Sequence, residues 1–161
     1  MLTFINVTAW ALMLGLPLFG LRRGSGAILC VGIYVFLFSI LIVVLAPTMA
    51  TALPVLSGAS HAVNLGWWQL LLFIPLFGLS FPLGMFLNRF LAHSFEPFEE
   101  TAGLVIGMVV GFIAARAFLG AMTLCTTGTD LQVAVEQLFL VRQTVALDGF
   151  RGVEEWFTTL N

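Results

Sequence analysis

The side chains best suited to acid-base chemistry lie in a short acidic segment that contains Glu96, Glu99 and Glu100. Paired carboxylates can act as a general acid and a general base when one of them is desolvated. Arg89 and His93 precede the segment, but no second catalytic partner accompanies it. We therefore expect a solvated cytoplasmic turn, or acidic residues that favour the N-terminus of a following helix, in preference to an active site.

The histidines and cysteines show no spacing typical of a metal or cofactor site. The chain has His61, His93, Cys30 and Cys125, without an H-E-x-x-H, C-x-x-C or nucleophile-elbow pattern. Neither histidine falls in the middle of an apolar run, where a haem ligand would be expected. We predict no enzymatic activity, no metal and no cofactor, and we interpret both cysteines as packing residues on opposite sides of a membrane.

Arg116 is the only charged residue inside the long apolar run 102–124. A charge within a membrane costs at least ~2.5 kcal/mol unless it is satisfied. At ~1.5 Å per residue Arg116 lies ~21 Å from the start of the run, so its guanidinium can extend to the lipid headgroups. The alternative is an ion pair or an anionic ligand, with Asp130 and Glu136 as candidate partners.

Three glycines spaced by four, Gly103, Gly107 and Gly111, lie in the same run and are named here the glycine seam. Small residues along one helix face let a second helix approach closely, which is how helices associate in lipid. Glycine is abundant, at 16 of 161 residues, so a single pair at this spacing is weak evidence for helix packing. Three glycines on one helix face are stronger evidence. We expect helix packing at the seam, within the chain or with a partner subunit.

Long apolar runs must position all of these residues. The chain is 60% hydrophobic and 9% charged, with a mean hydropathy of +1.09, whereas soluble domains have about 25% charged residues. Four runs are long enough to cross a bilayer, namely 2–21, 27–46, 67–88 and 102–124. We predict an all-α integral membrane protein with a four-span domain over 1–125, its third span kinked at Pro75 and Pro82.

The remaining segment, 126–161, is predicted to lie outside the membrane because charges interrupt it every few residues. Leu131, Val135 and Leu138 follow helical steps of three and four, which is typical of an amphipathic helix. We expect a helical tail that rests on the membrane surface or docks on a partner protein.

Arginine positions predict the orientation of the spans. Arg22 and Arg23 separate the first two runs and Arg89 follows the third, whereas 47–66 carries no charge. Because basic residues in short loops stay cytoplasmic, both termini are expected on the outer side, which is the periplasmic side of a bacterial inner membrane. The net charge of −2 excludes the basic surface that a nucleic-acid partner requires.

The order of these features resembles the bacterial colicin V production protein family (CvpA-like). In that family the first span ends in a G-x-x-R-G type of turn, which Arg23 and Gly24 match by position. Glu99 stands at the place of the family's aspartate, ahead of a glycine ladder that the glycine seam matches. Glu100 and Val110 differ from the family, which has arginine at both places.

The resemblance covers about residues 1–125 and implies a small four-span inner-membrane protein linked to envelope processes such as colicin secretion, without a known catalytic activity. Our leading hypothesis is a non-enzymatic accessory or scaffold subunit. It would sit in the lipid bilayer and pack against other membrane subunits, through the glycine seam and the tail. The alternative is a transporter or channel component that uses the kinked third span and Arg116.

Overall fold

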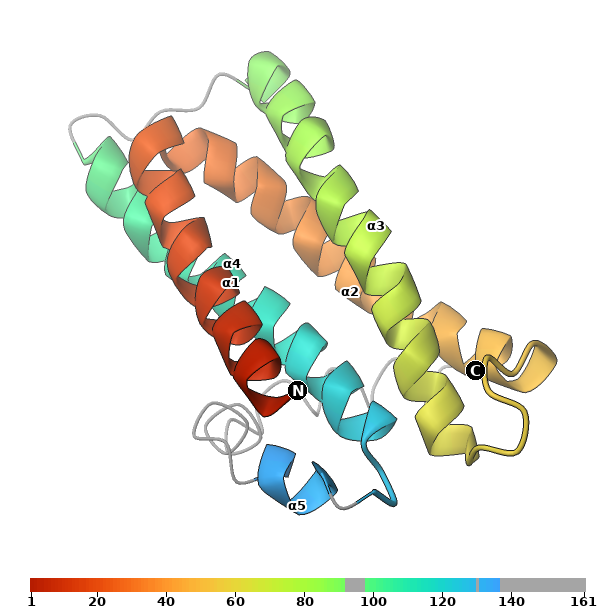
Figure 1. The fold of residues 1–161 in the computed structure, drawn as a ribbon. Helices are drawn as coiled ribbons and strands as arrows, with labels where there is room; N and C mark the ends of the chain where they lie inside the picture. Colours follow the sequence, from red (N-terminus) through yellow and green to blue (C-terminus); the bar gives the residue numbers. More distant parts are fainter. Residues whose placement is uncertain (92–97, 130, 137–161) are drawn as a thin grey trace.

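Helices make up nearly all of the chain that the computed structural model describes, which is residues 1–91, 98–129 and 131–136. Four of them are long and apolar enough to cross a membrane, and a short fifth helix follows (Figure 1). They are α1 (Leu2–Arg23), α2 (Ser25–Ala52), α3 (His61–Leu91), α4 (Glu99–Cys125) and α5 (Leu131–Glu136). The predicted all-α class with four candidate membrane spans is confirmed.

The helices extend beyond the predicted spans, most clearly at Pro47, which follows the predicted end of the second span at 46. α2 continues through Pro47 to Ala52, and α3, predicted to be kinked at Pro75 and Pro82, runs through both prolines as one helix. A proline removes one backbone donor, but in lipid the other backbone groups have no partners outside the helix, so the helical hydrogen bonds resume beyond it.

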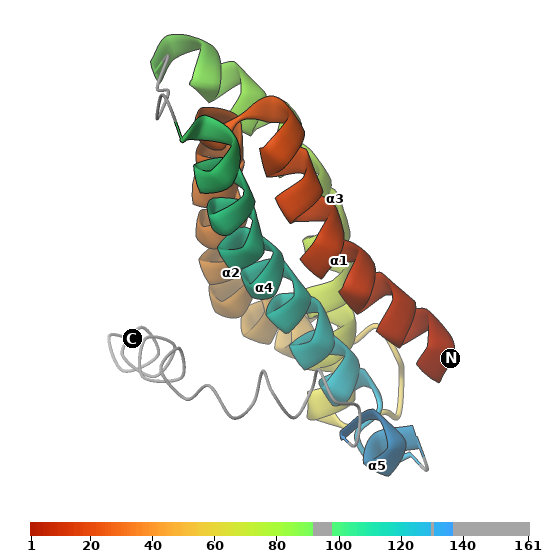
Figure 2. The same ribbon diagram turned by 90° about the vertical axis from the view of Figure 1, so that its left-hand side faces the viewer.

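α4 is the centre of the bundle because it packs against each of the other three spans. α1 makes most of its contacts with α4, whereas α2 packs mainly on α3. α1 and α2 diverge from Gly24, and the four spans form two pairs (Figures 1 and 2). The start of α1, the α2–α3 turn and α5 share one end of the bundle, here called the far end. The opposite end, where α1 ends and α4 begins, is called the arginine end.

Five phenylalanine rings pack together between α1, α3 and α4. Phe73, Phe77 and Phe81 follow one face of α3, and each neighbouring pair of ring centroids is 5.3 Å apart. Phe118 of α4 lies 6.3 Å from Phe73, and Phe19 of α1 lies 5.5 Å from Phe81. Offset and edge-on aromatic pairs stabilise beyond the area that they bury, so this cluster ties α3 to α1 and α4.

The Phe73→Ala variant tests this cluster, because the Phe73 side chain is only 7% exposed and contacts two other rings. Lipid is as apolar as the protein interior, so the loss comes from packing and from the cavity, and we expect about 2 kcal/mol less unfolding free energy. Thermal unfolding in detergent measures it. The control is Phe86→Ala, whose ring is 59% exposed, with an expected loss below about 0.5 kcal/mol. Equal losses in both variants would contradict the role of the cluster.

Candidate functional site

The glycine seam of α4 is filled by α1 of the same chain. A Cβ atom added at Gly107 would lie 2.6 Å from Cα of Pro17, and one added at Gly103 would overlap the carbonyl oxygen of Gly20. Gly111 meets the α1 backbone in the same way. Such contacts need two backbones in direct contact, which glycine alone permits. α1 of the same chain therefore occupies the seam, which is the first of the two arrangements expected from the sequence.

Other glycines make equally close contacts that the sequence analysis missed. A Cβ atom at Gly84 of α3 would lie 2.7 Å from Cα of Val31 in α2. One at Gly66 would lie 2.6 Å from the backbone nitrogen of Cys125, at the end of α4. These glycines belong to no ladder of four-residue steps, so their role becomes visible only when the partner helix is known.

A single residue, Gly24, joins α1 to α2 at the arginine end. Its φ angle of 86° lies in the left-handed region that favours glycine, and its backbone nitrogen donates to the carbonyl oxygen of Gly20 at 2.9 Å. Arg22 and Arg23 therefore lie in the last turn of α1, and not in the predicted loop between the first two spans. Positive charge at this place is favoured by the dipole of α1.

Glu99 of α4 covers the Gly24 turn. A Cβ atom at Gly24 would lie 2.5 Å from Oε1 of Glu99. Glu99 and Glu100 form the first turn of α4, where negative charge is favoured, so they are helical although the fourth span was predicted to begin at 102. Glu96 and His93 lie outside the described residues. The Gly24 turn and the Glu99 carboxylate, which lie far apart in the sequence, are thus in contact.

The Gly24→Ala variant measures this contact. Alanine is strained at a φ of 86° and its methyl group would displace the Glu99 carboxylate, so we expect about 2 kcal/mol less unfolding free energy. Gly58 is the matched control, with a φ of 87° and nothing within 4 Å of an added Cβ, and Gly58→Ala should lose only about 1 kcal/mol. Adding Glu99→Ala to Gly24→Ala should remove the clash and bring the loss of unfolding free energy close to that of Gly58→Ala. If thermal unfolding shows that the double variant is no more stable than Gly24→Ala, the contact is contradicted.

Ser25, the first residue of α2, is fully buried beside this turn. Its hydroxyl has no hydrogen-bond partner among the residues that the structure describes, and no side chain caps the N-terminus of α2. A Cβ atom at Gly103 would lie 3.2 Å from the Ser25 backbone nitrogen. α4 therefore contacts the start of α2 as well as the end of α1, and all three helices meet at the arginine end.

Arg116 is partly buried in α4 and takes part in at least one interaction within the chain. Of its two predicted partners, Asp130 lies outside the described residues. Glu136 is the last residue of α5, and the position of its side chain is also outside them. The ion pairs with Asp130 and Glu136 stay predictions, as does the amphipathic helix predicted beyond residue 136.

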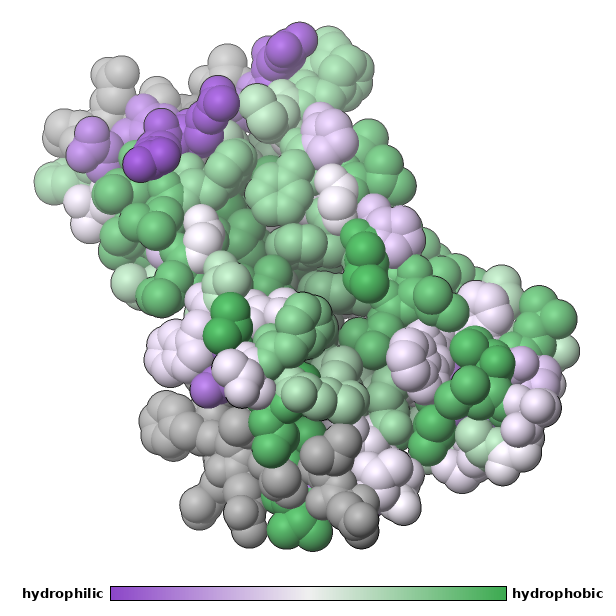
Figure 3. All heavy atoms as spheres, in the orientation of Figure 1, coloured by the Kyte–Doolittle hydropathy of each residue, from purple (hydrophilic) through white to green (hydrophobic). Residues whose placement is uncertain are grey.

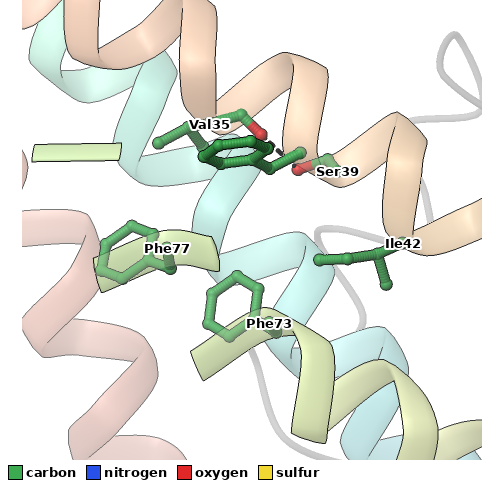
Figure 4. A pocket seen from close by; sticks show the side chains of 6 residues that line it. Val35, Ser39, Ile42, Phe73 and Phe77 are labelled. Atoms are coloured by element: carbon green, nitrogen blue, oxygen red, sulfur yellow. Dashed lines mark hydrogen bonds between the residues drawn. The ribbon is translucent and has the colours of Figure 1, made fainter. Parts of the chain in front are cut away.

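Hydroxyl groups inside the spans donate to carbonyl oxygens of their own helices. The distances are 2.7 Å from Ser39 to Val35 and 2.9 Å from Thr123 to Leu119. Ser39 also borders a small hollow between α2 and α3 (Figure 4), lined by Val35, Phe38, Ser39, Ile42, Phe73 and Phe77. Because the Ser39 hydroxyl is already hydrogen-bonded to its own helix, the hollow offers apolar surface. The Ser39 and Thr123 hydroxyls therefore do not form a polar path through the bundle.

Within the described ranges no three His, Cys, Asp or Glu side chains gather in a way that could hold a metal ion. Cys30 and Cys125 are free thiols. Comparisons with protein-family models, curated proteins and solved structures found no match. The function is therefore inferred from the chain's own residues.

Proposed function

We propose that the protein is a non-enzymatic accessory or scaffold subunit of the bacterial inner membrane, which acts by packing against other membrane proteins. The observation that carries the proposal is that the contacts within the chain lie between the spans, in the interior of the bundle. Phenylalanine rings fill the space between spans, α1 fills the glycine seam, and the hydroxyls bond to their own helices. Such a protein offers its surfaces to other molecules.

The exposed charges supply one polar surface, at the arginine end. Arg22, Arg23, Arg89 and Glu100 are all exposed. Figure 3 shows strongly hydrophilic surface gathered over this end of α1 and α4, whereas apolar surface covers most of the spans. A partner protein that contacts the arginine end would meet charges of both signs. Its helices would meet apolar faces, where packing by small residues drives association.

The resemblance to CvpA-like proteins favours an envelope or secretion-related role. The residues that carry it are neighbours, since Glu99 contacts Gly24 and Gly103 contacts Gly20. This supports the interpretation of the shared pattern as one structural joint between α1, α2 and α4. The joint would stabilise the fold, and a partner protein would bind elsewhere on the surface.

Three open glycines provide the test of the scaffold proposal. Gly15, Gly78 and Gly120 have nothing within 4 Å of an added Cβ, so leucine can be introduced there without disturbing the chain's own packing. Each variant would be purified from native membranes in mild detergent beside the wild type. We expect partner proteins with the wild type, and their loss from at least one variant of unchanged thermal stability. Absence of any partner from the wild type would contradict the proposal.

The alternative is a transporter or channel component that uses α3 and Arg116. Arg116 favours it, because a partly buried charge within a span is expensive. The hydroxyls bonded within their own helices argue against it. Flux in proteoliposomes separates the two functions, since a transporter should lose flux in Arg116→Leu while it still inserts, whereas a scaffold should show no flux in either form.

A further inference from the structure

We propose that the α2–α3 turn, residues 53–60, lies among the lipids of the far leaflet as a lipid-facing hairpin tip, and is not a loop in water. The occupant of its outer surface is the phospholipid interface, that is, the glycerol region and the upper acyl chains. Three independent features of the turn support this placement: its internal hydrogen bonds, its exposed apolar side chains and the lengths of the helices that carry it.

Asn64 satisfies the backbone of the turn from within. Its side chain is 4% exposed; Oδ1 accepts a hydrogen bond from the backbone nitrogen of Leu56 at 2.8 Å, and Nδ2 donates to the Leu56 oxygen at 3.2 Å. Nδ2 also lies 3.4 Å from the carbonyl oxygens of Ala59 and Ser60. In lipid an unsatisfied backbone group is costly, so these hydrogen bonds are what a turn at the lipid interface requires.

Trp68 closes the other side of the turn. Its indole Nε1 donates to the carbonyl oxygen of Leu53 at 2.7 Å, and the Leu53 nitrogen donates to the carbonyl of Met49 at 2.8 Å. Trp67 beside it is 39% exposed. Tryptophan is enriched where membrane meets water, because its ring is apolar and its N–H group is polar. The pair places the start of α3 at the level of the lipid interface.

The turn exposes apolar side chains beside the small residues Ser57, Gly58 and Ser60, and it carries no charge. Leu53, Val55 and Leu56 are 59%, 38% and 43% exposed, and no charged residue occurs between Gly24 and Asn88. In Figure 3 the end formed by α2 and α3 shows none of the strongly hydrophilic surface found at the arginine end. Neighbouring apolar side chains of this kind are favourable in lipid and unfavourable in water.

The lengths of the helices place the turn at the right depth. α2 has 28 residues and α3 has 31, which correspond to ~42 Å and ~46 Å at ~1.5 Å per residue. A bilayer is ~30 Å thick across its hydrocarbon core and ~40–45 Å with both interfaces. α2 starts and α3 ends at the arginine end, so both helices reach the opposite interface, and a modest tilt keeps the turn within it.

Spin labelling in nanodiscs tests the placement. A nitroxide would be attached to Leu56→Cys, in a background with Cys30→Ala and Cys125→Ala, and its collision with oxygen and with a water-soluble nickel chelate would be measured. Ile74→Cys in α3, 68% exposed, is the lipid control, and Glu100→Cys at the exposed start of α4 is the water control. We expect nickel collisions at position 56 roughly tenfold below those at position 100, with oxygen collisions close to those at position 74.

Two outcomes would overturn the proposal. Nickel collisions at position 56 equal to those of the Glu100→Cys label would place the turn in water. Low collision with both reagents would mean that protein, such as a second copy of the chain, covers the turn. Adding Asn64→Ala to the Leu56→Cys protein provides a second readout, because the unsatisfied backbone should draw the turn toward water and raise nickel collisions at least about threefold. Unchanged collisions would contradict the role given to Asn64.

Discussion

Replacing Gly107 with leucine is expected to force α1 away from α4 and to lower the free energy of unfolding by about 3 kcal/mol or more. A single Cβ atom at Gly107 would already lie 2.6 Å from Cα of Pro17 and 2.7 Å from the carbonyl oxygen of Leu16. Both are backbone atoms, so no side-chain rotation can relieve the clash. The helices must separate, and contacts along the whole α1–α4 interface weaken.

Gly120→Leu is the matched control, because Gly120 lies on the same helix with nothing within 4 Å of an added Cβ. It should unfold within about 0.5 kcal/mol of the wild type. Thermal unfolding in one detergent, followed by tryptophan fluorescence, compares the two variants directly. If Gly107→Leu were as stable as Gly120→Leu, the close α1–α4 contact would be refuted.

Neutralising three arginines is expected to disturb the orientation of the protein. Arg22 and Arg23 end α1, and Arg89 lies in the last turn of α3, so all three are at helix ends on one side of the bundle. We propose that this side is cytoplasmic, since arginine excess sets orientation. The triple Gln variant should show a mixture of orientations, with at least about half of the molecules inverted.

A C-terminal alkaline phosphatase fusion measures this effect, because the enzyme is active only outside the cytoplasm. We expect high activity for the wild type and a loss of about half for the triple variant. Replacing Arg142 and Arg151 of the tail with Gln is the control and should leave the activity unchanged. An inactive wild-type fusion would show that the proposed orientation is reversed.

Hydropathy and glycine spacing were enough to predict four spans and a packing seam, but they could not predict the partner of the seam. The spacing of Gly103, Gly107 and Gly111 requires a close helix without saying which one. The partner helix is identified by Gly20, which contacts Gly103, and by Pro17, which contacts Gly107. Both lie far from the seam in the sequence, at positions with no periodic signal of their own. Contacts between distant segments are set by packing in three dimensions.

Helix ends were the second feature that the sequence could not place. The second span was predicted to end at 46, just before Pro47, yet α2 continues through this proline to Ala52. Gly24 was expected to lie in a loop, whereas a positive φ lets this one residue join α1 to α2. The hydrogen bonds from Asn64 to the backbone of the α2–α3 turn were also not predicted, since a single asparagine carries no distinct pattern.

Disulfide cross-linking between α1 and α4 tests the central claim, that one chain fills its own glycine seam. Gly111 is the least crowded of the three seam glycines, because an added Cβ would lie 2.9 Å from the Leu12 carbonyl oxygen and 3.2 Å from Cα of Met13; a small shift of α1 therefore admits cysteine there and keeps a Met13→Cys and Gly111→Cys pair within disulfide reach. Both native cysteines would be replaced with alanine, and Leu14→Cys, whose native side chain is 57% exposed, would replace Met13→Cys as the control.

After mild oxidation in native membranes, the Met13→Cys and Gly111→Cys protein is expected to form a bond within one chain. It would appear as a monomer band with altered mobility that reductant restores, while the Leu14→Cys control stays unlinked. A dimer band that contains two differently tagged copies, formed in place of the altered monomer, would show that the seam joins two chains and would contradict the account.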